Sequence, residues 1–490
     1  MTRQGGQDAR RLGVATSLKL TLALIALAVF GAVALLGSKI HDPKYRTLVT
    51  VGPRVSLLIR NVRVFTGTGT IALETRQVRV QDGRITAIEP VTDRTPEGFE
   101  VIDGSGRTLL PGLIDFHVHV ANSSAPPWYL SLPNPTHNLE AYLYAGVTTI
   151  VNMGDDVDEI GPLAAKVERG EIPGPRILFA GMPITRKHGH PQASVDSFVP
   201  WPLGYLIPRF SYEIETPADA TTAVAVMKQG GASLVKMVVD DLPPGVPKLS
   251  PGLANAVVTA ARQVNLKVAA HVGRADDAVL AARSGASVLN HGVHRGVLRP
   301  EQAEELASLG VPVSPTIAVF ERCAELADGR IAFDELDREI EAKAVLDALA
   351  PQQIAKNRDS FAFLQPWLDE VSASKRHLGP NALTLHRAGV PIFVGTDSSV
   401  LGNIAGSSIH REMRLLSEAG IPAAEVLLGA TKRPAAFLFE DPEVGTIEVG
   451  KRADLLLVEG NPLEDIKTTR KIVAVIKDGR RVDRSIASDL

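Results

Sequence analysis

Cysteine is nearly absent from this chain of 490 residues, in which Cys323 is the only one. A single thiol cannot form a disulfide within the chain, and it excludes a zinc site built from several thiolates. Any metal site must therefore use histidine, carboxylate or a rarer ligand.

An excess of charge of one sign is also missing. The 52 lysines and arginines nearly balance the 55 aspartates and glutamates, so the formal net charge is −3. This balance gives no electrostatic reason to expect nucleic acid as a partner. With 45% hydrophobic and 22% charged residues, the composition is that of a globular protein, and it excludes a disordered or fibrous one.

One long apolar run stands out, the 18 uncharged residues Leu20–Gly37. A helix of that length rises roughly 27 Å, close to the ~30 Å hydrocarbon core of a bilayer. We expect an uncleaved transmembrane anchor, with residues 1–19 as a cytoplasmic tail and the rest of the chain outside the cytoplasm, periplasmic or extracellular. The alternative is a signal segment cleaved near Ala32-Val33-Ala34 and a secreted protein. The basic residues that set the orientation are Arg3, Arg10, Arg11 and Lys19.

Both ends of the remaining chain have the sequence pattern of short β-strands. Residues 38–54 are a polar link, and 55–112 contain short β-like segments broken by glycine and proline. Residues 440–490 repeat this texture, with Ala453–Val458 and Ile472–Lys477 as the clearest segments. We expect the two ends to pair into one composite sheet domain.

Residues 113–439 alternate between short apolar segments and alanine-rich helical stretches. Eight strands that alternate with helices predict a parallel sheet of the α/β class, and eight is the number that closes a TIM, or (β/α)8, barrel. The long connections 181–233 and 316–391 would cover the active mouth as lids or specificity loops. The predicted strands are Leu113–Val120, Thr148–Asn152, Arg176–Ala180, Leu234–Val239, Lys267–His271, Ser287–His291, Val311–Pro315 and Ile392–Asp397.

Histidines gather at the predicted strand ends. His117 and His119 close the first strand, and the two-residue period of a strand turns both imidazoles to the same face. Such a pair at the carboxyl end of a barrel strand has the geometry of a metal site. Lys236 lies within the fourth strand, and the fifth, sixth and eighth strands end at His271, His291 and Asp397. We therefore predict one shared metal site.

The chain resembles the amidohydrolase superfamily of metal-dependent TIM-barrel hydrolases, and within it the imidazolonepropionase-like and prolidase-like branch. The resemblance runs from about Val55 to the C-terminus and leaves the apolar run outside. It implies a barrel with a composite β-sandwich contributed by both chain ends. It is carried, in order, by PGLIDFHVHV, YAGVTTIVNMG, VKMVV, AHVGRADDAVLAARSGASVLNHG, VGTD and GTIEVGKRADLLLV.

Carried over residue by residue, the resemblance makes His117 and His119 ligands of a first metal, and His271 and His291 ligands of a second. Lys236, carboxylated by carbon dioxide, would bridge the two ions as a carbamate, which supplies anionic oxygens in place of a repelling ammonium. Asp397 would complete the first metal site and accept a proton. Zinc is the expected metal, with manganese, cobalt and iron as alternatives.

Several positions depart from the family pattern. Val151-Asn152 stands where relatives often have Arg-Asp, which affects only substrate detail. In the loop PITRKHGHP, His190 aligns best with a histidine that would polarise the substrate carbonyl, and His188 is its rival. For His410 and Glu412, which open a helix after the eighth strand, we expect structural capping.

The implied activity is hydrolysis of a C–N amide-type bond in a small molecule, such as a dipeptide, an N-acyl amino acid or a cyclic amide, by a hydroxide that bridges the metals. One alternative is a mononuclear deaminase of a nitrogen heterocycle. Such relatives commonly have a glutamate at the position of Arg274, and a one-metal site leaves Lys236 without a role. Two further alternatives are esterase, lactonase or phosphotriesterase activity at the same metal centre, and a binding scaffold without enzymatic activity. Oligomerisation stays open.

Overall fold

The computed structural model describes residues 41–198 and 210–485. The expected anchor at 20–37 and the tail at 1–19 lie outside these residues. Within the described ranges, no helix combines the length and the apolar character needed to cross a membrane.

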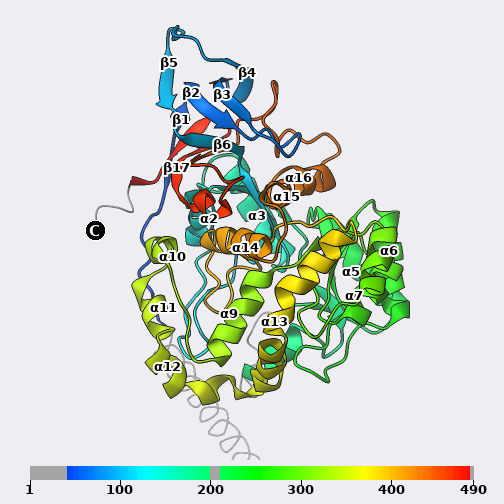
Figure 1. Ribbon diagram of the computed structural model, residues 1–490. Helices are drawn as coiled ribbons and strands as arrows, with labels where there is room; N and C mark the ends of the chain where they lie inside the picture. Colours follow the sequence, from blue (N-terminus) through cyan, green and yellow to red (C-terminus); the bar gives the residue numbers. More distant parts are fainter. Residues whose placement is uncertain (1–40, 199–209, 486–490) are drawn as a thin grey trace, which may run out of the picture.

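Both ends of the chain build one nine-stranded sheet at one end of the molecule (Figure 1). In this sheet β6 runs antiparallel to β16, with Leu110 opposite Leu456. The two chain ends therefore pair, as their shared texture predicted. The strand order is β1 (Thr50–Arg54), β18 (Arg480–Asp483), β17 (Ile472–Lys477), β16 (Leu455–Glu459), β6 (Arg107–Pro111), β2 (Ser56–Val64), β3 (Leu73–Gln81) and β4 (Arg84–Pro90), with β5 (Phe99–Asp103) beside β2.

The alternation of side chains between the two faces of each strand explains how this sheet packs. Leu57 and Ile59 on β2, and Leu455 and Leu457 on β16, are wholly buried in one hydrophobic cluster. Residues two apart on a strand share a face, so each strand contributes every second side chain to this core.

The polar link expected over residues 38–54 is part of the folded body from His41 onward. Leu48 and Val49 are wholly buried, and the Leu48 amide donates to Glu140 at 2.7 Å. The strand β1 then begins at Thr50, five residues before the β-like texture was expected to start.

Seven of the eight strands predicted for the middle of the chain are present, in two parallel sheets. Their pairing orders are β7-β8-β9 and β11-β10-β12-β13-β14-β15. The bounds are β7 (Leu113–Val118), β8 (Val147–Asn152), β9 (Arg176–Phe179), β10 (Ile184–Arg186), β11 (Tyr212–Ile214), β12 (Leu234–Val238), β13 (Lys267–His271), β14 (Val288–Asn290) and β15 (Val313–Ser314).

The eighth predicted strand, Ile392–Asp397, is not a regular strand in the structure. Single parallel bridges join Ile392 to Val313 and Ser398 to Val118. The amides of Thr396 and Asp397 both donate to the carbonyl of His117, and Asp397 has a φ of 59°. The Phe393 amide donates to Val313 and the Phe116 amide to Val394, so the segment lies between β15 and β7. It makes only single bridges and turns left-handed at Asp397, so the prediction of a regular strand here was wrong.

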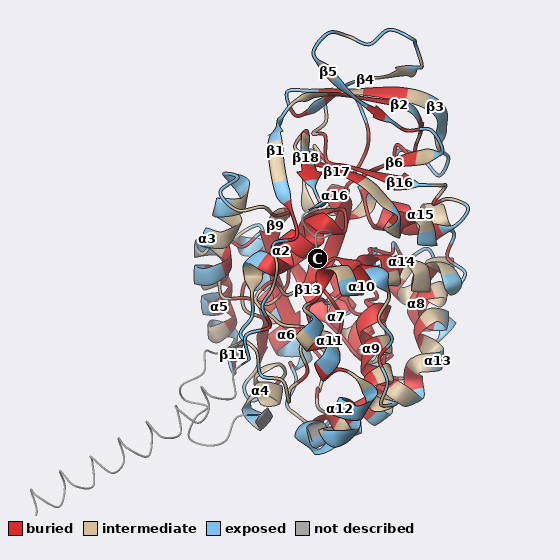
Figure 2. Ribbon diagram, turned by 90° about the vertical axis from the view of Figure 1, so that its left-hand side faces the viewer, coloured by how far each residue is buried: buried red, intermediate tan, exposed pale blue. Residues whose placement is uncertain are grey.

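Helices cover the parallel strands, and Figure 2 shows buried strands inside and exposed outer helix faces. Their starts follow from local sequence: the Thr216 and Ser250 side chains accept backbone amides of the next turn, and a proline follows each. The helices between strands are α2 (Pro135–Tyr144), α3 (Val157–Glu168), α4 (Gln192–Phe198), α5 (Pro217–Gln229), α6 (Pro251–Gln263), α7 (Ala275–Arg283) and α8 (Pro300–Ser308).

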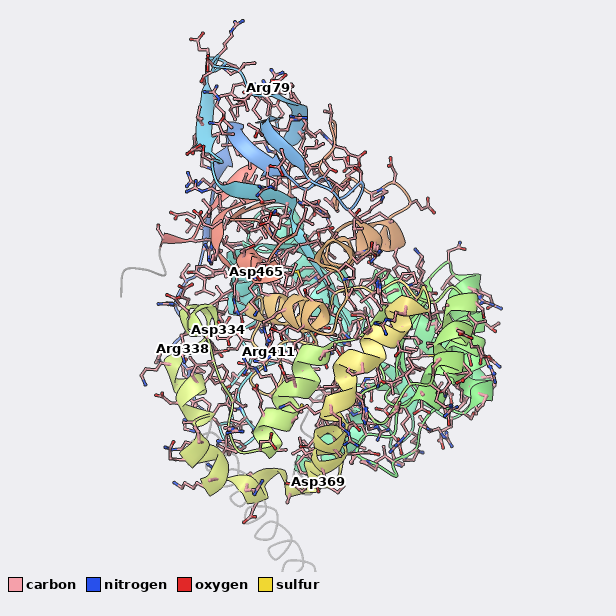
Figure 3. All side chains as sticks on the ribbon, viewed as in Figure 1. Arg79, Asp334, Arg338, Asp369, Arg411 and Asp465 are labelled. Atoms are coloured by element: carbon pink, nitrogen blue, oxygen red, sulfur yellow. The ribbon has the colours of Figure 1, made fainter. Side chains whose placement is uncertain are left out.

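The long segment 316–391 folds into helices. The charged stretch 334–349 forms two short helices, α10 and α11, with Asp334 capping α10. Arg338 and Asp369, labelled in Figure 3, are exposed on α10 and α13. The bounds are α9 (Ile317–Ala327), α10 (Glu335–Ile340), α11 (Lys343–Ala348), α12 (Pro351–Lys356), η2 (Arg358–Leu364) and α13 (Gln365–Arg387); α14 (Ser407–Glu418), α15 (Ala423–Gly429), α16 (Lys432–Leu438) and η3 (Ile466–Arg470) follow.

Candidate metal centre

The first predicted ligand group comes together beyond the end of β7. The Nε2 atoms of His117 and His119 lie 3.3 and 2.9 Å from one oxygen, Oδ1, of Asp397. Their possible ligand atoms all lie within 4.8 Å of one another. Both imidazoles therefore face the same side, and the carboxylate meets them there.

Two glycines make room for these histidines. A Cβ at Gly154 would lie 2.8 Å from the His119 ring, and one at Gly395 would lie 3.0 Å from the His117 amide nitrogen. The first distance is too short for a side chain and the second is tight, and a Cβ at Gly395 would also lie 2.3 Å from Ser314 Oγ. Larger residues here would displace the histidines, so these glycines help to position the site.

A buried carboxylate ties the Asp397 segment to β7. Asp115 accepts hydrogen bonds from the Thr396 amide at 3.0 Å and the Thr396 hydroxyl at 2.7 Å. Burial raises the pKa of Asp115 to about 7. We did not single out Asp115 from the sequence, although an aspartate inside an otherwise apolar strand is a signal of such a role.

The second predicted ligand pair lies against the first. His271 Nδ1 and His291 Nε2 are 3.0 Å apart, and the ring centroids of His291 and His117 are separated by 4.7 Å. Lys236 is 2% exposed, and its Nζ lies 3.5 Å from His117 Nε2. The six residues predicted as metal ligands thus form one connected cluster.

The opposite ring nitrogen of two of these histidines has its own partner. His271 Nε2 lies 3.3 Å from Asp240 Oδ2, and His291 Nδ1 lies 2.8 Å from Thr316 Oγ1. When the outer nitrogen carries the proton and donates it to oxygen, the inner nitrogen keeps a lone pair that can bind a metal. The inner nitrogens are His271 Nδ1 and His291 Nε2, which face each other.

His117 has a comparable outer partner in Asn290. The amide Nδ2 lies 2.8 Å from His117 Nδ1, while Oδ1 of Asn290 has no partner among the described residues. Rotating the amide by half a turn lets Oδ1 accept from Nδ1–H, which leaves the Nε2 lone pair facing Asp397 and Lys236.

Electrostatics prepares these groups to act as ligands. Burial lowers the pKa of His117, His271 and His291 well below the ordinary value, and it lowers the pKa of Lys236 to about 7. The imidazoles are therefore neutral near pH 7, as metal binding requires. Neutral imidazoles beside a carboxylate make a donor set that suits zinc and similar divalent ions.

Backbone strain is concentrated at the same place. His291, Thr316 and Asp397 have φ angles of 69°, 48° and 59°. A side chain other than glycine in this left-handed region costs on the order of 1–3 kcal/mol per residue, and such residues cluster at functional sites. Glycine would relieve the strain, but it would remove the two ligands and Thr316.

Of the two rival loop histidines, only His190 reaches the cluster. Its ring centroid lies 5.1 Å from that of His271, and its Nδ1 lies 3.2 Å from Ser194 Oγ. Burial lowers the pKa of His190 to about 3, so the ring is neutral. His188 is exposed, and its backbone amide donates to Glu213 at 2.7 Å.

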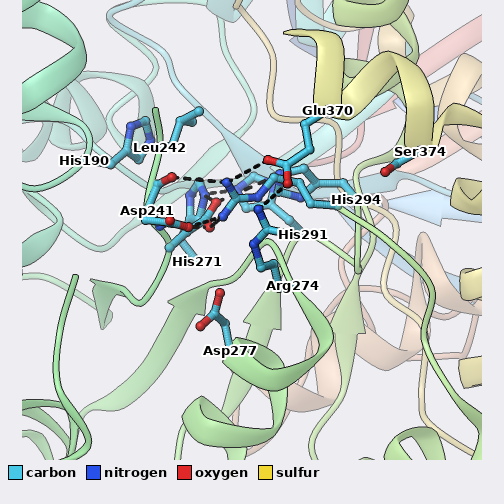
Figure 4. Close-up of polar contacts among 12 residues, drawn as sticks. His190, Asp241, Leu242, His271, Arg274, Asp277, His291, His294, Glu370 and Ser374 are labelled. Atoms are coloured by element: carbon cyan, nitrogen blue, oxygen red, sulfur yellow. Dashed lines mark hydrogen bonds and ion pairs between the residues drawn. The ribbon is translucent and has the colours of Figure 1, made fainter. Parts of the chain in front are cut away.

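An ionic network that we did not foresee surrounds the second pair (Figure 4). The guanidinium of Arg295 is wholly buried and pairs with Asp240, Asp241 and Glu370. Arg274, at the position discussed for deaminases, also pairs with Glu370. Asp240, Asp241 and Asp277 form a second acidic group, but Arg295 and Lys248 already neutralise it.

Asn152, Glu412 and His410, which the sequence analysis placed away from the metal site, all have structural contacts. Asn152 accepts the Val120 amide at 2.8 Å, a structural role at the end of β7. Glu412 accepts the Ala318 amide at 2.7 Å and so caps α9 rather than its own helix α14. His410 also caps another helix, because its Nε2 lies 2.9 Å from the carbonyl of Ala145, the C-cap residue of α2, while its Nδ1 lies 3.0 Å from Thr469 Oγ1.

Comparisons with known proteins agree with this geometry. A family model described as the amidohydrolase family matches residues 108–482. An imidazolonepropionase from Sphingopyxis alaskensis is 24% identical over 410 residues, which cover 79% of this chain and 87% of the relative. An ochratoxinase from Aspergillus niger is 24% identical over 391 residues, 75% of this chain and 73% of the relative.

A solved structure shares the fold. A Xaa-Pro dipeptidase with methionine bound in its active site superposes with a TM-score of 0.68 at 24% identity, and covers 87% of this chain and 99% of the other.

Proposed function

The chain belongs to the amidohydrolase family, and from that membership we propose that it hydrolyses an amide-type C–N bond in a small molecule with the help of two divalent metal ions. Hydrolysis of C–N bonds is the activity that the family and the relatives have in common. Dipeptides, N-acyl amino acids and cyclic amides are the proposed substrates.

The observation that carries the proposal is the convergence of four histidine side chains, one lysine and one carboxylate in a single cluster. His117, His119 and Asp397 would hold one ion. His271 and His291 would hold the other, and Lys236 would lie between them. The Asp240, Thr316 and Asn290 side chains would keep the ligand nitrogens turned inward.

Lys236 would serve as a carbamate. Because burial lowers its pKa to about 7, a substantial fraction of the ε-amine is uncharged near neutral pH and can attack carbon dioxide. The nitrogen forms a bond to carbon and loses one proton, which yields an anionic carbamate with two oxygens that can bind metal.

Bound divalent ions would polarise the scissile carbonyl and make an attacking water acidic near neutral pH. Asp397, whose Oδ1 would hold the ion with His117 and His119, would use its other oxygen to take the proton from the attacking water and return it to the leaving nitrogen. His190 would bind the substrate carbonyl oxygen. Ser194 Oγ lies 3.2 Å from His190 Nδ1 and 3.4 Å from the Leu242 carbonyl. The His190 tautomer in which the Ser194 hydroxyl donates to Nδ1 carries the proton on Nε2, and that N–H would be the donor.

Metal analysis combined with a substrate screen tests this proposal. We expect about two equivalents of divalent metal per chain, and turnover of at least one member among dipeptides, N-acyl amino acids and cyclic amides that stops on chelation. Metal-free protein with full activity would overturn it. Release of ammonia from a heterocycle by a protein with one metal would support the deaminase instead.

The proposal also includes the barrel and the membrane anchor that the sequence predicts. We propose that the two parallel sheets and the segment 392–397 together form the (β/α)8 barrel. We also propose that Leu20–Gly37 anchors the protein in a membrane with the catalytic part outside the cytoplasm.

A further inference from the structure

Two leucines are conspicuously exposed on the loop that connects β7 to α2. Leu130 is 48% and Leu132 is 66% exposed. The loop begins directly after His119, so it rises from the end of the parallel strands that carries the candidate metal centre. The loop that carries the leucines therefore starts at the mouth of the candidate metal centre, at the opposite end of β7 from β6 of the nine-stranded sheet.

The loop that carries these leucines is firmly supported. The indole of Trp128 donates to the Ala348 carbonyl at 3.0 Å, and Trp128 and Tyr129 pack against the buried cluster that contains Leu349. The two leucines are therefore exposed on a loop that is itself packed against the protein core.

The N-terminal segment joins the body at this same loop. The His41 amide donates to the Leu130 carbonyl at 2.7 Å, His41 bridges to Ser131, and the His41 ring stacks on Tyr129 at 4.2 Å. From there the chain runs past α10 toward β1, as its dark blue trace in Figure 1 shows. Arg46 donates to the Glu339 carbonyl on this path.

The chain between the apolar run and this loop is short. Four peptide units separate Gly37 from His41, and they span at most about 14 Å when fully extended. If Leu20–Gly37 spans a bilayer, His41 and the loop beside it must lie at the membrane surface.

We propose that Leu130 and Leu132 insert into the interfacial layer of the lipid bilayer and hold the catalytic mouth toward the membrane. The proposal rests on the proposed anchor. Exposed apolar side chains beside a membrane-spanning segment favour contact with the headgroup region.

The test uses the full chain reconstituted into phosphatidylcholine vesicles, with a fluorophore attached to a Leu132→Cys variant. Cys323 is buried and burial raises the pKa of its thiol, so the unsubstituted chain serves as the labelling blank. The matched control is Val449→Cys. Val449 is 64% exposed on a loop whose Gly450 amide donates to Ile85 in the nine-stranded sheet.

We expect nitroxide-bearing lipid to quench the label at position 132 several-fold more than the label at 449, and aqueous iodide to do the reverse. Equal quenching of the two labels would overturn the docking. Release of the chain from vesicles by an alkaline carbonate wash would overturn the anchor and the docking together. Hydrolysis measured in detergent tests the proposed function separately from both.

Discussion

Asp240 Oδ2 lies 3.3 Å from His271 Nε2, and this contact decides which nitrogen of His271 faces His291. The carboxylate is wholly buried and is held from its other side by Arg295. A charged partner of this kind fixes the tautomer and the orientation of a ligand histidine, and it raises the basicity of the inner nitrogen.

Asp240→Asn should therefore weaken metal binding by about 10–100-fold, the usual effect of losing such a partner. Competition with a chelator measures this directly. Asp277→Asn is the matched control, because Asp277 belongs to the same acidic group but pairs with Lys248. Equal metal affinity in both variants would contradict the role of Asp240.

Lys236→Ala should lose at least one metal ion and most activity, since the side chain proposed to bridge the two metal ions disappears. Elemental analysis gives the stoichiometry, and short carboxylic acids should restore part of the activity. Lys248→Ala, which removes a half-exposed lysine paired with Asp277, should keep its metal. A metal-replete and fully active Lys236→Ala variant would rule out the two-metal site.

Asp397→Asn separates metal binding from proton transfer. Asparagine is nearly isosteric and keeps one oxygen ligand, but it cannot take up a proton near neutral pH. The variant should hold much of its metal while kcat falls by about 10²–10⁴-fold. Wild-type turnover would mean that the proton leaves by another route.

His190→Ala should lower kcat by about 10²–10³-fold, the scale for removing one donor to a developing oxyanion, with metal content unchanged. His188→Ala is the control, since His188 is exposed and should tolerate the change. Steady-state kinetics on whichever substrate the screen identifies would decide between them. A larger loss in the His188 variant would reverse the assignment.

Glu412 should make stability depend on pH. Burial raises its pKa to about 8 in the folded state, from 4.5, so the folded chain keeps a proton that the unfolded chain releases. The free energy of unfolding should fall as pH rises from about 4.5 to about 8 and then level off.

Glu412→Gln still accepts the Ala318 amide but has no proton to lose. Its stability relative to the wild type should therefore grow over this range, reaching an advantage on the order of a few kcal/mol. Urea unfolding at pH 5, 7 and 9 measures it. Parallel pH profiles for the two proteins would contradict the assignment.

Much of the site follows from the sequence by itself. Side chains alternate along a strand, and the carboxyl ends of parallel strands meet at one edge. The positions of His117, His119, His271, His291 and Lys236 within their segments therefore predicted that these side chains would gather. Strand and helix bounds also follow from local signals, such as the Ser250-Pro251 start of α6.

Tertiary structure alone decided what surrounds these ligands. Asp240 meets His271 across 31 positions and Asn290 meets His117 across 173, and no local period relates such residues. The ion pairs of Arg295 with Asp240 and Asp241 could not be predicted either, since only folding brings its guanidinium to these carboxylates. Residues 392–394 still hydrogen-bond to β15 and β7, but at Asp397 the contacts of this segment with His117 and Asp115 replace a regular strand by a left-handed turn, which no local period predicts.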